Sequence, residues 1–226
     1  MIQPTRGLNE FRKRLHESFH LGGLSFSTMR LVRHSNVYVC GDPAETVYFL
    51  ESGQVKLVMP SPHGKECFLA LHTAGDLFGE LCLEGTRRRQ ETAKAMEDTT
   101  LKSIPRANLF PHLSRHSLLE GFVQYLAARV AEQQRVMGAL LTVDSEHRLG
   151  ETLLALARKL GRPDPRSTRI EQKITHEELS EMVGTTRPRI TRFMLAFRAL
   201  GLIEITPEHF LIIKEQKLTD YLAGIA

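Results

Sequence analysis

Apolar positions fall into three successive patterns along the 226 residues of the chain. Between residues 30 and 105, short runs that alternate apolar and polar side chains are separated by turn residues. Such alternation is typical of β-strands, whose side chains point in turn to the two faces of a sheet. Many short strands at this spacing predict an antiparallel β jelly-roll barrel, because closure leaves no exposed sheet edge. We expect strands at 37–39, 47–50, 55–58, 67–71 and 101–104, with turns at 41–43, 52–53, 60–64, 75–76 and 85–86.

From about Ser114 to Val143 the apolar spacing changes to three and four residues, which predicts one long amphipathic helix. A long helix that leaves its apolar stripe free for a partner favours pairing with a second subunit as a coiled coil. The alternative is burial against its own domain. Both hold if one side packs on the barrel and the other on a partner. The stripe comprises Leu118, Phe122, Tyr125, Leu126, Val130, Gln133, Met137, Leu140 and Leu141.

The third pattern begins at Asp144-Ser145, which is typical of a helix cap after a hinge. An amphipathic helix is predicted at 149–160, and the loop 161–165 ends it. Further on, 202–206 and 210–213 predict a β-hairpin, and 215–225 a short final helix. The predicted division is therefore a barrel domain at 1–113, a long dimerisation helix at 114–143, and a third domain at 144–226.

Two short helical patterns separated by a glycine occupy the middle of this third domain. The first opens with Thr175 and has Glu178 three residues later, a capping box in which each side chain satisfies a free backbone amide. Gly184 interrupts the pattern, and Thr185 or Thr186 can cap a second helix. The apolar stripe of that helix predicts burial of Ile190, Phe193, Met194 and Phe197.

The outward face of this second helix is rich in arginine. Pro188, Arg192 and Leu195 point away from the stripe, and residues 185–200 contain no acidic side chain. The net charge of the chain is only +4, so this cluster is local. A helix-turn-helix of this kind suits the DNA major groove; the alternative is an ordinary solvated helix pair. The predicted DNA-binding residues are Thr185, Thr186, Arg187, Pro188, Arg189, Thr191, Arg192 and Arg198.

A candidate zinc motif lies near the N-terminus. His16, Glu17 and His20 match the pattern in which two histidines bind zinc and the glutamate activates water. Phe26 stands where a third histidine would be needed, and Arg12–Arg14 would place three cations beside the metal. We therefore favour a solvated charged helix over a zinc hydrolase, and expect no metal site and no enzymatic activity.

The remaining side chains with metal-binding chemistry are scattered. His112 and His116 are four residues apart beside an expected helix start, without a carboxylate or cysteine nearby, and we expect them at the surface. Cys40, Cys67 and Cys82 form an odd, scattered set, which argues against a disulfide framework and for a reducing compartment. With no N-terminal signal and no apolar run of about 18 residues, a cytoplasmic protein without a membrane span is predicted.

In this order of elements the sequence resembles the Crp/Fnr family of bacterial transcription regulators. The resemblance covers essentially the whole chain and rests on the motifs at 41–43, 48–55, 75–81 and 174–192. It implies a winged helix-turn-helix domain, a homodimer about the long helix, and an inverted-repeat operator in double-stranded DNA. Two recognition helices about 34 Å apart would meet successive major grooves. RNA polymerase is a further expected partner.

The same resemblance implies a small-molecule site in the barrel. In relatives that bind cyclic AMP, Gly-Glu-Leu begins a phosphate cassette that closes with Arg-Ser/Thr-Ala; here Gly79-Glu80-Leu81 and Arg89 match. The glutamate would accept from a ribose hydroxyl and the arginine would pair with the phosphate. The candidate effector-binding residues are Gly79, Glu80, Leu81, Cys82, Arg89, Gln90, Gln133 and Gln134.

This site departs from the family pattern at two places. Gln90-Glu91 follows the arginine, and a carboxylate beside a phosphate costs on the order of 1 kcal/mol or more. Gln133-Gln134 replaces the Thr-Ser pair that recognises adenine. Cyclic AMP is therefore disfavoured. Another nucleotide, such as a cyclic dinucleotide drawn to Arg87–Arg89, and a regulator without any effector both stay open.

Two other cofactors of the family are not expected. The iron–sulfur branch of the family uses cysteines clustered near the N-terminus, whereas the first of the three cysteines here is Cys40, so one chain cannot supply four cysteine ligands. Haem needs an axial ligand, for which His72 and Cys82 are loose candidates outside any specific motif.

Relatives commonly place Arg-Glu in the first turn of the recognition helix and an arginine one turn later. Here Arg187, Pro188 and Arg192 stand at these positions. The two arginines can pair with guanine or clamp a phosphate, but proline cannot accept a hydrogen bond from cytosine. We predict a half-site that departs from the family's TGTGA-type pattern there. Arg189 and Arg198 are expected to contact phosphates.

Overall fold

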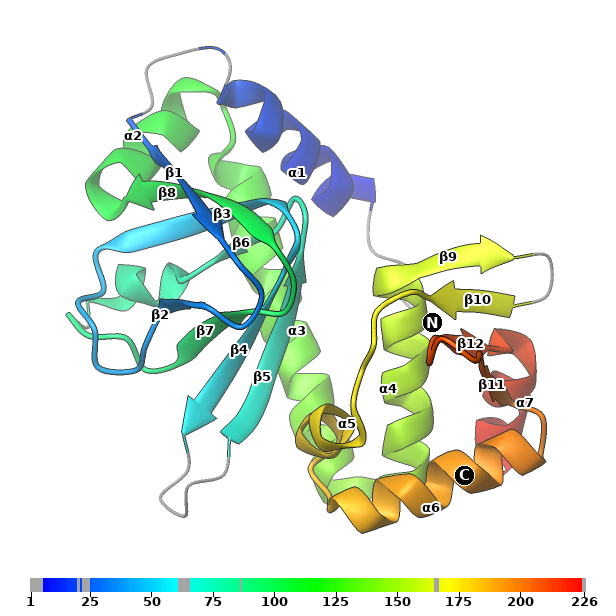
Figure 1. The fold of residues 1–226 in the computed structure, drawn as a ribbon. Coiled ribbons are helices and arrows are strands. Elements are labelled where there is room, and N and C mark those ends of the chain that lie inside the picture. Colours follow the sequence, from blue (N-terminus) through cyan, green and yellow to red (C-terminus); the bar gives the residue numbers. More distant parts are fainter. Residues whose placement is uncertain are drawn as a thin grey trace. The chain divides into compact units, whose positions relative to one another are not determined.

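The computed structural model describes residues 6–19, 21, 25–60, 66–85, 87–164 and 167–224. The chain divides into two compact units, Met1–Gln133 and Gln134–Ala226 (Figure 1). Within the described ranges, no helix is both long enough and apolar enough to cross a membrane.

The first unit contains two four-stranded antiparallel sheets, with strand orders β1-β8-β3-β6 and β2-β7-β4-β5. The predicted jelly-roll arrangement is confirmed. The predicted closure into a barrel is wrong, because no strand pairing joins the two sheets in the described part of the chain. The strands are β1 (Ser27–Leu31), β2 (Asn36–Tyr38), β3 (Thr46–Ser52), β4 (Gln54–Pro60), β5 (Glu66–Thr73), β6 (Leu77–Phe78), β7 (Thr92–Ala95) and β8 (Thr99–Pro105).

All five predicted strands are present, as β2, β3, β4, β5 and β8. The strands β1, β6 and β7 were not predicted. β6 has two residues, too few for an alternating pattern, and the apolar positions of β7 are alanines, whose side chains give a weak signal. Pairing with longer neighbours, β3 for β6 and β4 for β7, explains why these segments are extended.

Helices complete the first unit: α1 (Arg6–Ser18), the 3-10 helix η1 (Glu80–Glu84), α2 (Arg106–Arg115) and the first part of α3 (Leu119–Thr142). The predicted helix start at Ser114 is wrong. Ser117 has a φ of 54°, a left-handed conformation that a continuous helix cannot contain, so α2 and α3 are separate. The helices share one buried cluster with the first sheet, which includes Phe11, Leu15, Phe49, Ile104, Leu109, Leu113, Phe122 and Tyr125.

The stripe of α3 changes character along the helix. Leu118, just before the helix, and Phe122 and Tyr125 within it are buried in the core of the first unit. Further along, Met137 and Leu141 are 63% and 83% exposed. Burial against its own domain therefore accounts for the beginning of the stripe only.

The second unit has a four-stranded sheet with the order β11-β12-β10-β9 and four helices after the end of α3. The β-hairpin predicted after the helix-turn-helix is confirmed by β11 and β12. The final helix ends at Gly224; Ile225 lies outside the described residues. The elements are α4 (Ser145–Leu160), β9 (Gly161–Asp164), β10 (Ser167–Ile170), α5 (His176–Val183), α6 (Arg187–Ala199), β11 (Ile203–Ile205), β12 (Leu211–Ile213) and α7 (Glu215–Gly224).

The loop predicted at 161–165 is wrong, because 161–164 is strand β9 paired with β10. Gly161 does end α4, but as the first residue of the strand. A Cβ atom there would lie 1.9 Å from a methyl of Thr168 and 2.3 Å from the carbonyl oxygen of Ala157. A side chain at this position would therefore collide with neighbouring chain segments. From the sequence alone, a glycine required by such close packing looks the same as one that only ends a helix.

His112 is not at the surface, as was predicted, but 1% exposed. Its Nε2 lies 2.7 Å from the hydroxyl oxygen of Ser18, and its ring stacks on Phe19. Burial lowers the pKa of His112, with His116 as a second cause. Helices α1 and α2 bury His112 between them, and no local sequence pattern predicts this packing.

Candidate nucleic-acid interface and effector site

The helix-turn-helix is fixed by local contacts at its start and its turn. The hydroxyl oxygen of Thr175 accepts from the Glu178 amide at 3.1 Å, and the Glu178 carboxylate accepts from the Thr175 amide at 2.8 Å. The predicted capping box is therefore confirmed. Gly184 ends α5 with a φ of 66°, in the left-handed region that favours glycine, and α6 begins three residues later at Arg187.

The two faces of α6 are as predicted. Ile190, Phe193, Met194 and Phe197 are buried. Pro188 lies in the first turn, where a backbone N–H would have no acceptor within the helix. The missing N–H of proline is therefore compatible with the helix start. The opposite face exposes Arg187, Pro188, Arg189, Arg192, Leu195 and Arg198.

The threonines have different environments. Thr186 is the N-cap residue of α6, but its side chain makes no capping hydrogen bond, so it leaves an exposed hydroxyl at the helix start. Thr185 is half-buried, and its amide donates to the Ser180 carbonyl at 3.0 Å. Thr191 is half-buried too, with its hydroxyl 2.9 Å from Nδ1 of His176 on α5. Thr191 therefore helps to fix α5 against α6.

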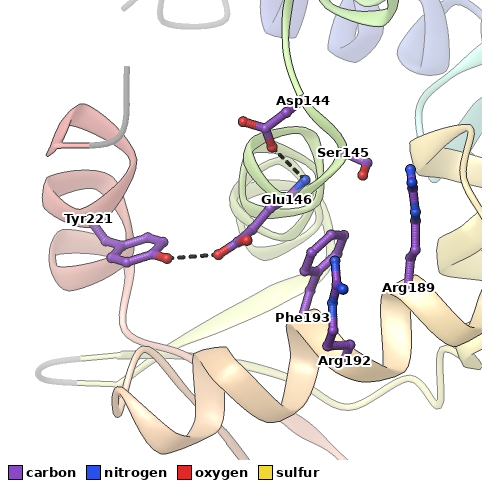
Figure 2. A pocket seen from close by; sticks show the side chains of 7 residues that line it. All are labelled: Asp144, Ser145, Glu146, Arg189, Arg192, Phe193 and Tyr221. Atoms are coloured by element: carbon purple, nitrogen blue, oxygen red, sulfur yellow. Dashed lines mark hydrogen bonds between the residues drawn. The ribbon is translucent and has the colours of Figure 1, made fainter.

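A pocket of about 370 Å³ lies beside α6, at the N-terminal end of α4 (Figure 2). Glu146 lies within it and accepts from the Tyr221 hydroxyl at 2.7 Å, a hydrogen bond that raises the pKa of Tyr221. No sequence pattern indicated this arrangement, because the side chains come from three separate helices. The pocket is lined by Asp144, Ser145, Glu146, Arg189, Arg192, Phe193 and Tyr221.

Asp144 is the N-cap of α4, as the sequence predicted. One carboxylate oxygen accepts from the amides of Glu146 and His147 at 2.8 and 3.0 Å. The carboxylates of Asp144 and Glu146 are thus both held by protein donors, while Arg189 and Arg192 enter the pocket from α6. Two arginines of the exposed face of α6 therefore also line the pocket at the start of α4.

In the first unit, Arg89 is the centre of the candidate effector site. It is 4% exposed, and its Nη1 and Nη2 donate to the carbonyls of Gly79 at 2.9 Å and Thr46 at 2.5 Å. Its guanidinium lies 4.1 Å from the ring centroid of Tyr38 and 5.4 Å from that of Tyr48. The basic triplet is therefore not uniform: Arg87 and Arg88 are exposed, whereas Arg89 is internal.

Gly79 is required next to this arginine. Its φ of 77° is left-handed, and a Cβ atom would lie 2.8 Å from Nη1 of Arg89. The Gly41-Asp42-Pro43 turn holds the other side: the Gly41 amide donates to the Arg89 carbonyl, and the Arg89 amide to the Asp42 carbonyl. Two motifs that are far apart in sequence thus fix the same arginine.

Glu80 is also engaged. Its carboxylate lies 3.5 Å from Nη2 of Arg129 on α3, and both side chains are 15% exposed. Although burial disfavours the charge of Arg129, Glu80 first and then Tyr125 and Asp76 hold its pKa above the usual value. A ribose hydroxyl at Glu80 would therefore share the carboxylate with Arg129, a residue that the sequence did not single out.

The other predicted effector residues do not all converge on Arg89. Leu81 is 43% exposed, and Gln90 is exposed, donating to Glu84 at 3.4 Å. Cys82 is buried, and burial raises the pKa of its thiol. Gln133 and Gln134 are both exposed on α3, at the point where the first unit ends.

The zinc motif gains no support from its surroundings. His16 and Glu17 are exposed on α1, and Glu17 lies 3.9 Å from Lys13; His20 lies outside the described residues. Within the described ranges, no group of three or more potential metal ligands is found. His72, the loose haem candidate, is buried with Nδ1 at 3.7 Å from Asp76.

Comparison with known proteins agrees with both units. The family described as a cyclic nucleotide-binding domain matches residues 28–116, and the Crp-like helix-turn-helix domain matches residues 147–221. A global nitrogen regulator from Synechocystis sp. is 35% identical over 179 residues, which cover 77% of this chain and 79% of the relative.

Further relatives cover a similar share. A CRP-like cAMP-activated global transcriptional regulator from Mycobacterium tuberculosis is 26% identical over 187 residues, covering 82% of this chain and 84% of the relative. The crystal structure of a CRP-family transcriptional regulator from Thermus thermophilus, 27% identical, superposes with a TM-score of 0.73 and covers 87% of this chain and 96% of that one. The protein belongs to the Crp/Fnr family of transcription regulators.

Proposed function

We propose that the protein is a homodimeric, sequence-specific DNA-binding regulator in which α6 enters the major groove. The observation that carries this is the outward face of α6, with four exposed arginines and no acidic residue from 185 to 200. Arg187 and Arg192 are assigned to base or phosphate contacts, and Arg189 and Arg198 to phosphates. Thr185, Thr186 and Thr191 flank this face, with the exposed hydroxyl of Thr186 best suited to a phosphate.

Pairing through α3 supplies the second half of the interface. The side chains of Val123, Val130, Met137 and Leu140 are 63%, 52%, 63% and 47% exposed. With Leu126 and Gln133 they alternate at spacings of three and four, which is the a/d seam of a coiled coil. In this division of roles, 1–113 is the effector-type domain, 114–143 the dimerisation segment and 144–226 the DNA-binding domain.

A dimer of this kind recognises an inverted repeat, with half-sites about 34 Å apart. Pro188 and Leu195 add apolar contacts, for instance to thymine methyl groups, where relatives carry a glutamate in the first turn. The half-site therefore differs from TGTGA at the position that the glutamate would contact. RNA polymerase and a cytoplasmic location follow from the same role.

The signal is not cyclic AMP in this proposal. Arg89 is held by backbone carbonyls and Glu80 by Arg129, while Gln90-Glu91 and Gln133-Gln134 depart from the family pattern. Relatives themselves differ, since one is named a cAMP-activated regulator and another a nitrogen regulator. A different nucleotide and regulation without an effector are the two alternatives.

Fluorescence anisotropy with labelled genomic DNA fragments, measured over a range of salt concentrations, tests DNA binding. Arg187→Ala/Arg192→Ala should weaken binding by at least tenfold and lower the salt slope by about one for each arginine that contacts a phosphate. Arg158→Ala is the matched control, because Arg158 is an exposed arginine in the last turn of α4 and is not part of α6. Equal binding by the double variant and the wild type would refute the assignment of α6.

The zinc hydrolase is the competing function, and metal analysis separates the two. Protein purified without chelators should contain only trace zinc, less than about one zinc per ten chains. It should also keep its DNA binding in the presence of EDTA. Stoichiometric zinc that disappears upon His16→Ala would favour the hydrolase instead.

A further inference from the structure

The candidate effector site contains a buried charge that the proposed function leaves unused. Glu91 is 2% exposed and lies two residues after Arg89, in the segment that leads into β7. A carboxylate so deeply buried is costly unless hydrogen bonds or an opposite charge compensate it. Its partners therefore indicate what it does.

Tyr38 links Glu91 to Arg89. Its hydroxyl donates to Oε1 of Glu91 at 2.7 Å, and its ring centroid lies 4.1 Å from the guanidinium carbon of Arg89. Burial first, and then Glu91, raise the pKa of Tyr38, so its hydroxyl stays protonated and continues to donate. Glu91, Tyr38 and Arg89 thus form one linked group, through a hydrogen bond at the hydroxyl and a cation–π contact at the ring.

Arg89 is already engaged by the protein backbone. Nη1 and Nη2 each donate to a backbone carbonyl, at Gly79 and Thr46. Among the described residues, Nε of Arg89 and Oε2 of Glu91 are buried without a hydrogen-bond partner. A guanidinium has five N–H groups, and the two bonds to carbonyls use two of them. An anion arriving at Arg89 would compete with the two carbonyls, and the buried Glu91 carboxylate would repel it.

We propose that Glu91 is a specificity-determining residue of this site: its buried carboxylate, linked to Arg89 through Tyr38, keeps a negative charge where an anionic effector group would bind, and so excludes nucleoside cyclic monophosphates. In the family pattern the position two residues after the arginine is alanine, which leaves that place uncharged. This inference deepens the proposed function, because it rests on Arg89 belonging to the effector site. It does not depend on DNA recognition by α6.

Calorimetric titration of the full-length protein with cyclic AMP and with cyclic GMP, without DNA, tests the proposal. The wild type should bind either nucleotide more weakly than about 1 mM. Glu91→Gln keeps an acceptor for the Tyr38 hydroxyl but removes the charge, and Glu91→Ala removes the side chain. Each should bind at least one of the two nucleotides at least tenfold more tightly than the wild type.

Two controls separate the role of Glu91 from general effects. Glu84→Ala removes an exposed carboxylate, which accepts from Gln90 at 3.4 Å, and should bind as weakly as the wild type. Adding Arg89→Lys to Glu91→Gln should abolish the gained binding, since a lysine cannot reproduce the planar contacts of the guanidinium. Far-UV circular dichroism establishes that each variant is folded.

Micromolar binding of either nucleotide by the wild type would overturn the proposal. So would folded Glu91→Gln protein that binds no better than the wild type, a result that decides the matter even where Glu91→Ala fails to fold. The two proposals fail separately. Absence of the tenfold gain leaves the anisotropy result on α6 untouched, and an inactive α6 leaves the calorimetric result standing.

Discussion

Arg148 connects the end of α3 to the helix-turn-helix within the second unit, and its removal should destabilise that unit. Its Nε donates to the Val183 carbonyl at 2.9 Å, and its Nη1 to the Val143 carbonyl at 2.5 Å. A third, longer contact of 3.4 Å reaches the Gly184 carbonyl. One side chain therefore donates both to the carbonyl that follows α3 and to carbonyls at the end of α5, where the turn of the helix-turn-helix begins.

The expected destabilisation follows from these hydrogen bonds. A hydrogen bond from a charged donor contributes about 1.5–3 kcal/mol, and Arg148 makes two short ones, at 2.9 and 2.5 Å. Because the side chain is only half-buried and water can replace part of each bond, we expect Arg148→Ala to lower the free energy of unfolding by about 2–3 kcal/mol. Each kcal/mol shifts the Tm of a domain of this size by about 4–8 °C.

Urea unfolding followed by circular dichroism measures this destabilisation. Arg148→Lys tests the geometry, because one ammonium group cannot reach all three carbonyls, and it should recover less than half of the difference. Arg158→Ala, on the exposed face of the same helix, should change the free energy of unfolding by no more than about 0.5 kcal/mol. If Arg148→Ala is as stable as Arg158→Ala, the inferred role of the arginine is refuted.

Three further predictions concern the two candidate sites and the dimer. Gly79→Ala should lower the Tm of the first unit more than Gly85→Ala in thermal unfolding, since both glycines have positive φ but only Gly79 lies against Arg89; equal decreases would contradict this. Gln133→Leu should tighten dimerisation at least tenfold in sedimentation equilibrium, because a polar seam position costs stability, and unchanged dimerisation would remove Gln133 from the seam. Pro188→Glu should shift the selected half-site towards TGTGA, and an unchanged half-site would place Pro188 away from the bases.

Local signals were sufficient to predict the helix-turn-helix. The Thr175–Glu178 capping box and the periodic stripe of α6 depend on residues a few positions apart, so the sequence contains the whole interaction. The same holds for the cap at Asp144. The exposure of Arg187, Pro188 and Arg192 follows directly from the buried stripe, because helical periodicity fixes both faces together.

Contacts between distant segments were beyond such signals. Gly161 was correctly expected to end a helix, but its close approach to Thr168 depends on how β9 and β10 pair. His112 is buried by α1, which lies about ninety residues earlier in the sequence, as its contact with Ser18 demonstrates. Polar and charged residues are mostly exposed in proteins, and only tertiary packing reverses that tendency at a given position.

The candidate effector site could be predicted only in part. The family pattern singled out Gly79, Glu80 and Arg89 as candidates and marked Glu91 as a departure. It did not indicate that Tyr38, from another strand, would bridge Arg89 and Glu91. A tyrosine in an alternating strand is expected in the core whatever its neighbours are. Its contacts with Arg89 and Glu91 depend on the register of β2 with β7, which the sequence does not give.

Recognition of DNA by α6 is best tested by in vitro selection of binding sites from random double-stranded DNA, followed by sequencing. We predict enrichment of an inverted repeat whose half-site centres are about 34 Å, or one helical turn, apart. Its half-sites should depart from TGTGA at the position that a glutamate in place of Pro188 would contact. Absence of any enriched sequence, or recovery of full TGTGA half-sites by the wild type, would contradict this mode of recognition.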